Sequence, residues 1–245
     1  MARYKVILAY DGTDYAGFQR QAARVSIQQE VEAALRSIGW KGRAILASGR
    51  TDSGVHASGQ VISFDLSWKH GEQALLHALN ANLPEAITAQ QITIAPDDFH
   101  PRYDAIARDY GYQIYCQPVR QPLKQRYAWR VWPAPDIILM NLAAQDLIGE
   151  HDFVAFGKAL KPEGTTMRNV HQAEWKIAPD GCTFHIQANA FLYHMVRRIV
   201  YVLVQIGLGK QDVTIVRRGL ETGDTGLVAL APAQGLMLQC VYYKA

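Results

Sequence analysis

In the first hundred residues, stretches with the apolar pattern of a strand alternate with stretches in which apolar residues recur at helical spacing. Val6 to Tyr10 is a compact apolar run ended by Asp11-Gly12, which is typical of a buried strand closed by a turn. After Ser26, apolar residues recur at helical spacing, and Gln29 three residues later predicts a capping box. Further strands are expected at 44–48, around Ile62 to Leu66, and at 87–94, with a second helix at 71–80. The resulting order, β-α-β-β-α-β, is that of a ferredoxin-like unit.

The second part of the chain repeats this order of elements. Strands are predicted at 107–116, 170–177, 183–190 and 236–243, and helices at 136–148 and 191–208. The basic, polar stretch 120–130 is expected to be an exposed loop. We therefore predict an α+β fold of two ferredoxin-like halves with mainly antiparallel sheets. The N-terminal domain would span 1–104 and the C-terminal domain 105–245.

Composition and charge say more about the protein's cellular location than about its function. About half of the 245 residues are apolar and about a fifth are charged, as in soluble globular proteins, and a net charge of +3 permits a nucleic-acid partner without arguing for one. Three cysteines, an odd number, lie far apart. The longest apolar stretch, 191–208, carries two arginines, which favours a buried helix over a membrane span. We expect a cytoplasmic protein with no membrane segment.

A polar loop, Gly49-Arg-Thr-Asp-Ser-Gly54, separates two of the predicted strands. By itself, such a loop is typical of a turn in which Asp52 binds nearby N–H groups. Signals for other chemistries are absent from the sequence: the lysine of a phosphate-binding loop, a G-x-G-x-x-G turn, and metal-ligand spacing among the histidines and cysteines.

The longer segment Gly49 to Ala57 closely resembles the signature G-R-T-D-A-G-V-H-A of the TruA-type tRNA pseudouridine synthases, with Ser53 in place of alanine. Other segments in the same order are similar to segments of that family. They are Tyr10 to Arg20 with Ser26 to Gln28, Asn80 to Pro84, Asp98 to Arg102, and Asn189 to Ile199. The resemblance therefore covers nearly the whole chain.

The resemblance implies an isomerase that converts uridine to pseudouridine at positions 38 to 40 of the tRNA anticodon stem-loop. It implies a homodimer that needs neither a cofactor nor a metal. It also makes Asp52 the essential carboxylate. Such a group can stabilise the electron-poor sugar, act as a nucleophile, or remove a proton, and the sequence leaves these three roles open.

Two residues of the second half have roles implied by the same resemblance. Tyr110 would stack on the target uracil after the base has left the RNA helix, and its hydroxyl could also handle the C5 proton, whereas an unassigned strand tyrosine usually packs in a core. Tyr112 is expected to be such a packing residue. Arg197 would pair with Asp52 and keep it ionised, whereas a lone helix arginine usually reaches the surface. Together these roles imply an active-site cleft between the halves.

Further basic side chains are candidates for contact with the RNA. Arg50 is close enough to Asp52 in sequence to occupy the space of a flipped base or to hold a phosphate. His56 is expected to be structural. The other candidates, each of which is individually typical of a solvated surface charge, are Arg20, Arg24, Arg102, Arg108, Lys158, Lys161, Arg168 and Arg198.

Two other classes of function remain as alternatives. A non-catalytic RNA-binding protein of the RRM kind would share the ferredoxin-like unit, but its RNP1 pattern is missing and the Asp52 loop would have no purpose. A glycosidic hydrolase would use Asp52 to release free uracil. The chemical fate of the uracil separates both alternatives from an isomerase.

Overall fold

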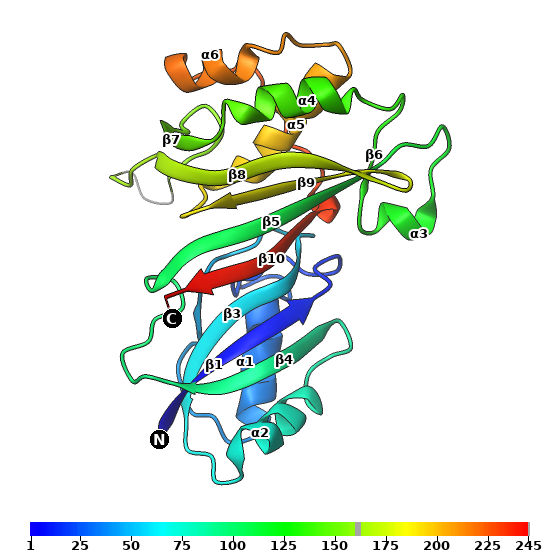
Figure 1. Ribbon diagram of the computed structural model, residues 1–245. Coiled ribbons are helices and arrows are strands. Elements are labelled where there is room, and N and C mark those ends of the chain that lie inside the picture. Colours follow the sequence, from blue (N-terminus) through cyan, green and yellow to red (C-terminus); the bar gives the residue numbers. More distant parts are fainter. Residues whose placement is uncertain (160–162, 245) are drawn as a thin grey trace. The chain divides into compact units, whose positions relative to one another are not determined.

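The structure is a computed structural model and describes residues 1–159 and 163–244 (Figure 1). It divides into two compact units. Unit 1 comprises Met1–Ile106 together with the C-terminal segment from Leu238, and unit 2 comprises Ala107–Met237. The domain boundary predicted from the sequence includes that C-terminal segment in the second half. In the structure the segment groups with unit 1, where its strand pairs with β3.

Unit 1 is built on an antiparallel sheet with the strand order β4-β1-β3, and both β10 and β2 pair with β3. Its first six elements follow the predicted β-α-β-β-α-β order. The elements are β1 (Ala2–Tyr10), α1 (Ile27–Ser37), β2 (Leu46–Ala47), β3 (His56–Leu66), α2 (Gly71–Asn80), β4 (Ile87–Ala95) and β10 (Leu236–Tyr243).

The core of unit 1 lies between the sheet and its helices. Alternate residues of β1, from Tyr4 to Tyr10, are buried, while those between them are only half-buried. Helix α1 turns its apolar stripe, including Val31 and Leu35, inward. The Ser26 hydroxyl accepts a hydrogen bond from the Gln29 N–H at 3.3 Å, which confirms the predicted helix start.

The main strands of unit 2 are antiparallel and follow the order β5-β9-β8-β7, and β6 pairs with β5 in parallel. Helices α4, α5 and α6 lie on one side of these strands (Figure 1). The chain as a whole is therefore α+β with mainly antiparallel strands, as predicted. The elements are β5 (Ala105–Tyr115), α3 (Pro122–Gln125), β6 (Trp129–Arg130), α4 (Ile137–Gln145), β7 (Gly149–Asp152), β8 (Met167–Ala178), β9 (Gly181–Ala188), α5 (Met195–Gly207), α6 (Ile215–Thr222) and the 3-10 turn η1 (Ala233–Gly235).

Helix α5 is the buried helix that the sequence predicted, but its predicted start at residue 191 was wrong. The helix begins at Met195 because His194 takes a left-handed conformation with φ 65°, which no α-helix can contain. Within the described residues, no helix is long and apolar enough to cross a membrane. The stretch 120–130, expected to be loop throughout, includes the single turn α3 and the short strand β6, and α6 was not predicted.

Candidate active site

Asp52 lies in unit 1, on the loop that joins β2 to β3, and its side chain is half-buried. The loop is turned tightly: the Asp52 carbonyl accepts from the Val55 N–H at 3.1 Å, and Gly54 takes a positive φ of 76°. Thr51 is buried, and its hydroxyl is 2.9 Å from the Tyr10 hydroxyl. The loop is thus anchored beside Asp52, while Arg50 is exposed.

A buried polar network fixes the base of this loop. The Gln60 amide donates to the Gly49 carbonyl at 3.1 Å and accepts from the Ser48 hydroxyl at 2.6 Å. It also lies 3.5 Å from the Tyr10 hydroxyl. Burial raises the pKa of Tyr10 to about 12, so this hydroxyl keeps its proton at neutral pH and remains a donor.

A second loop, residues 11–25, packs against the Asp52 loop. The Phe18 N–H donates to the Thr51 carbonyl at 3.0 Å, and the Ser53 hydroxyl donates to the Tyr15 carbonyl at 3.1 Å. Gly17 sits at the contact with φ 90°, and a Cβ atom there would lie 2.7 Å from the Thr51 carbonyl oxygen. Only glycine fits this conformation and this approach. Asp52 is therefore bracketed by two residues that are bound to the second loop.

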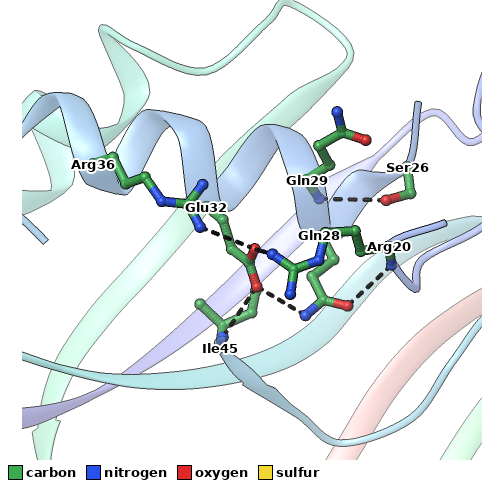
Figure 2. Close-up of polar contacts among 7 residues, drawn as sticks. All are labelled: Arg20, Ser26, Gln28, Gln29, Glu32, Arg36 and Ile45. Carbon is green, nitrogen blue, oxygen red and sulfur yellow. Dashed lines mark hydrogen bonds and ion pairs between the residues drawn. The ribbon is translucent and has the colours of Figure 1, made fainter. Parts of the chain in front are cut away.

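Helix α1 and one buried carboxylate hold the second loop in turn. The first N–H groups of α1, from Ile27 and Gln28, donate to the carbonyls of Gly17 and Phe18 at 3.2 and 2.9 Å. Figure 2 shows Glu32, which is fully buried, at the centre of a set of donors. It accepts from Arg20 Nη1 at 2.8 Å, Gln28 Nε2 at 2.8 Å, the Ile45 N–H at 3.2 Å and Arg36 Nη2 at 3.5 Å.

The Glu32 cluster gives Arg20 a role that the sequence analysis missed. Arg20 was predicted to contact the RNA. In the structure its guanidinium forms an ion pair with Glu32, while 46% of the side chain remains exposed. A signal was present in the sequence, because Glu32 interrupts the apolar stripe between Val31 and Leu35. A carboxylate in such a position is rarely buried without a cationic partner.

His56 also holds the second loop. Its Nδ1 accepts a hydrogen bond from the Gly12 N–H at 3.1 Å, and its side chain is buried. This contact joins the start of β3 to the turn that follows β1. It fits the structural role expected for His56.

Tyr110 lies in unit 2, on β5 opposite Ile186 of β9, and is half-buried. Its ring meets the Phe191 ring edge to face, with the ring centroids 5.0 Å apart at 81°. Tyr112, two residues further along β5, is fully buried and donates to the Pro232 carbonyl at 2.7 Å. Tyr112 therefore packs in the core, as expected, whereas part of Tyr110 faces solvent.

Arg197 lies in the first turn of α5 and is also half-buried. Its Nε donates to the Ala231 carbonyl at 2.8 Å, and the Ala231 N–H donates to the Arg197 carbonyl at 3.1 Å. This reciprocal pair ties α5 to the segment before η1. The neighbouring Arg198 has a buried Nε that finds no hydrogen-bond partner among the residues the structure describes.

The other predicted basic residues are scattered over both units. Arg108 donates to the Asn189 carbonyl at 2.7 Å, and Arg168 donates to the Thr165 carbonyl at 2.9 Å. Burial lowers the pKa of Arg168 from its usual value. Arg24 and Arg102 are exposed, and Lys158 pairs through its backbone with Tyr193. Lys161 lies outside the described residues.

The predicted site residues thus fall into two groups. Asp52, Arg50, Arg20 and Arg102 belong to unit 1, and Tyr110, Arg197, Arg168 and Arg198 belong to unit 2. The pairing of Arg197 with Asp52 and the cleft between the halves stay predictions. Among the residues the structure describes, no group of three histidine, cysteine, aspartate or glutamate side chains is arranged to hold a metal ion.

The family model described as tRNA pseudouridine synthase matches residues 6–104 and 143–244, in both units. The chain therefore belongs to the tRNA pseudouridine synthase family.

Individual relatives extend this similarity over almost the full length. Each of the three that follow is named tRNA pseudouridine synthase A. The protein of Histophilus somni (strain 2336) is 41% identical over 237 residues, covering 96% of this chain and 88% of that protein. The protein of Syntrophotalea carbinolica is 38% identical over 99% of this chain and 97% of its own. That of Latilactobacillus sakei is 38% identical over 99% of both chains.

Proposed function

We propose that this chain isomerises uridine to pseudouridine at positions 38 to 40 of the tRNA anticodon stem-loop, with Asp52 as the essential carboxylate. The observation that carries the proposal is the family match across both units, together with near full-length relatives of one name. The geometry of the Asp52 loop supports the choice of residue. Its neighbours Thr51 and Ser53 are each fixed by a hydrogen bond to the second loop.

The reaction defines what the site has to do. The bond between C1′ of the ribose and N1 of uracil breaks, the uracil turns while it stays bound, and C1′ joins C5. The hydrogen at C5 leaves as a proton and N1 gains one, so no group is lost and no electron is transferred to another molecule. An ionised Asp52 can stabilise the electron-poor sugar, attack C1′, or accept the C5 proton. A carboxylate held on a preorganised loop serves each of these roles without a large rearrangement.

Unit 2 would supply the groups that hold the base and the carboxylate. Tyr110 would stack on the flipped uracil, replacing stacking energy of about 1–3 kcal/mol that the base loses on leaving the helix. Phe191 supports this role because its edge-on contact limits rotation of the Tyr110 ring. Arg197 would pair with Asp52 through its terminal guanidinium nitrogens, since its Nε is bound to Ala231.

The remaining assignments concern the partners. We place Arg50, Arg102, Arg168 and Arg198 against the RNA backbone. Arg20 would contact the backbone through the guanidinium N–H groups that do not bind Glu32. The exposure of Arg50 and Arg102 supports such contacts. A cytoplasmic homodimer is the assembly that we propose for the active enzyme.

Tritium release tests the function and the catalytic assignment together. A tRNA transcript labelled at C5 of uridine is incubated with wild type, Asp52→Ala, and the matched control Glu85→Ala, which removes an exposed carboxylate of the same unit. Joining C1′ to C5 must expel the label. We expect release by wild type and the control, and none by Asp52→Ala.

Three other outcomes would each contradict a different part of the proposal. Release by all three proteins would keep the isomerase function and remove Asp52 from its role. Binding of the transcript by wild type without release would favour the RNA-binding alternative. Free uracil in the products would favour the hydrolase.

A further inference from the structure

Unit 1 contains a cavity of about 740 Å³ that the proposed mechanism does not use. It lies where β1, the end of β4 and the end of β10 meet the segment 96–106, and volumes of this size are typical of ligand sites. The lining residues with chemical function are Lys5, Phe99, Tyr103, Asp104, Tyr243 and Lys244.

Lys5 gives the cavity a half-buried positive charge. Its Nζ lies 4.2 Å from the centroid of the Tyr243 ring and 5.5 Å from that of Phe99. Among the described residues, no carboxylate lies within ion-pair distance of this ammonium. Arg3, two residues earlier on the same face of β1, instead pairs with Asp65 at 2.8 Å. Desolvation lowers the pKa of Lys5, which is the expected effect of burying an ammonium that has no anion beside it.

The rim of the cavity adds an aromatic surface and a second charge. Tyr103 is 77% exposed, unusually so for a tyrosine, and one side of its ring meets His100 at a centroid distance of 4.2 Å. Lys244 is exposed beside the cavity. The one carboxylate in the lining, Asp104, accepts from the His100 N–H at 2.8 Å and so caps its own turn.

We propose that this cavity binds a nucleotide of the substrate RNA, with the phosphate on Lys5 and Lys244 and the base stacked on Tyr103. An unpaired ammonium next to an exposed ring is the combination with which proteins hold single-stranded nucleotides. The proposal rests on the proposed function, since it takes tRNA as the substrate.

The site is separate from the one that holds the target uridine. Lys5 precedes Tyr10, whose hydroxyl meets the Asp52 loop, by five residues on β1. At roughly 3.3 Å per residue, the two points are about 17 Å apart along the strand. A nucleotide bound at Lys5 therefore belongs to another part of the RNA, and its loss should weaken binding without slowing the chemical step.

Binding of a tRNA transcript at several salt concentrations tests the proposal. We expect Lys5→Met to weaken binding about five- to tenfold and to reduce the salt dependence by about one ion. Tyr103→Ala should weaken binding by at least about fivefold with an unchanged salt dependence, because stacking releases no counterion. Lys5→Arg and Tyr103→Phe should bind nearly as wild type. The matched control is Lys69→Met, which removes an exposed lysine of the same unit.

Two further measurements separate this proposal from the proposed function and from simple misfolding. Tritium release at saturating tRNA should be the same for Lys5→Met and wild type, and failure of wild type to release tritium would refute the function instead. Lys244→Gln changes an exposed side chain and should weaken binding about two- to fivefold without affecting folding. Binding as tight as wild type by all three loss variants would overturn the proposal, as would an equal loss in Lys69→Met.

Discussion

Two carboxylates of unit 1, Glu32 and Asp52, lie in different surroundings. Glu32 is fully buried, and four donors converge on its own oxygens (Figure 2). Asp52 is half-buried, and the residues on either side of it are bound through the Thr51 hydroxyl, the Thr51 carbonyl and the Ser53 hydroxyl. The first arrangement uses a carboxylate to stabilise a loop. The second uses a loop to place a carboxylate.

The two are also connected in series. Glu32 accepts hydrogen bonds from Arg20 and Gln28. The first N–H groups of α1 donate to the carbonyls of Gly17 and Phe18, and the Phe18 N–H donates to the Thr51 carbonyl. If Asp52 is the catalytic carboxylate that we propose, Glu32 should matter most for stability and Asp52 most for the reaction. We therefore expect a substitution at Asp52 to reduce mainly the reaction rate, and a substitution at Glu32 to reduce mainly the stability.

The largest effect is expected for Asp52→Asn. The amide keeps the shape but has no negative charge, so the rate of tritium release should fall by at least about 10³-fold, at the upper range of single acid–base groups. The free energy of unfolding in urea should stay within about 0.5 kcal/mol of wild type. A loss of more than about 2 kcal/mol would show that Asp52, like Glu32, has a structural role.

Glu32→Gln should show the reverse pattern. It leaves the Arg20 guanidinium without its anion and turns an N–H₂ group toward other donors, so unfolding should become easier by about 3 kcal/mol. The rate per folded molecule should change by less than tenfold. The double variant Arg20→Met with Glu32→Gln should recover part of the stability. Full stability of the single variant would contradict the comparison.

Tyr10→Phe tests the middle of the series. It leaves the buried Thr51 hydroxyl without its partner and should cost about 1–2 kcal/mol of stability. The turnover rate should also fall a few-fold with an unchanged KM for tRNA, because Thr51 adjoins Asp52. Tyr4→Phe is the matched control, since Tyr4 lies on the same buried face of β1 and packs against Phe64. An equal effect of the two variants would remove Thr51 from the positioning of Asp52.

Asp65 adds a third carboxylate, and the effect of changing it should be the smallest. Hydrogen bonding to Arg3 lowers the pKa of Asp65 below its usual value. The pair therefore contributes stability above the unfolded-state pKa of about 3.9, and this is lost as pH falls through the lower folded-state pKa. Because the pair is partly exposed, Asp65→Asn should cost less than about 1 kcal/mol at pH 6 and nothing near pH 2. Urea denaturation at several pH values measures both.

The first half of the fold was predictable because its signals are local. The apolar run before Asp11 gives the observed end of β1 at Tyr10, although the strand begins at Ala2, before the predicted Val6, and the Ser26 cap gives the start of α1. The start of α5 was not predictable by the same means. Leu192 is buried like a helix residue, and nothing in the apolar pattern reveals the left-handed turn at His194.

The site divides along similar lines. Asp52 could be proposed from the sequence because its loop carries a contiguous motif, and a motif can be recognised without knowledge of the fold. The Glu32 cluster joins residues from the second loop, α1 and the approach to β2, so its partners are defined only by the folded chain. The cavity around Lys5 was invisible for the same reason: Lys5 and Tyr243 are nearly the whole chain apart in sequence. Contacts of long sequence separation are what a pattern of residues does not encode locally.

The pairing of β10 with β3 has a consequence for biosynthesis. In the sequence, unit 2 lies between the two segments of unit 1, so the ribosome must make Ala107–Met237 before β10 is complete. Until then the β3 edge that receives β10 has no partner along that stretch, and an uncovered edge is a template for pairing with other chains. A nascent chain halted within unit 2 should therefore aggregate or recruit chaperones. Unit 1 is completed only when β10 has left the ribosome and can pair with β3.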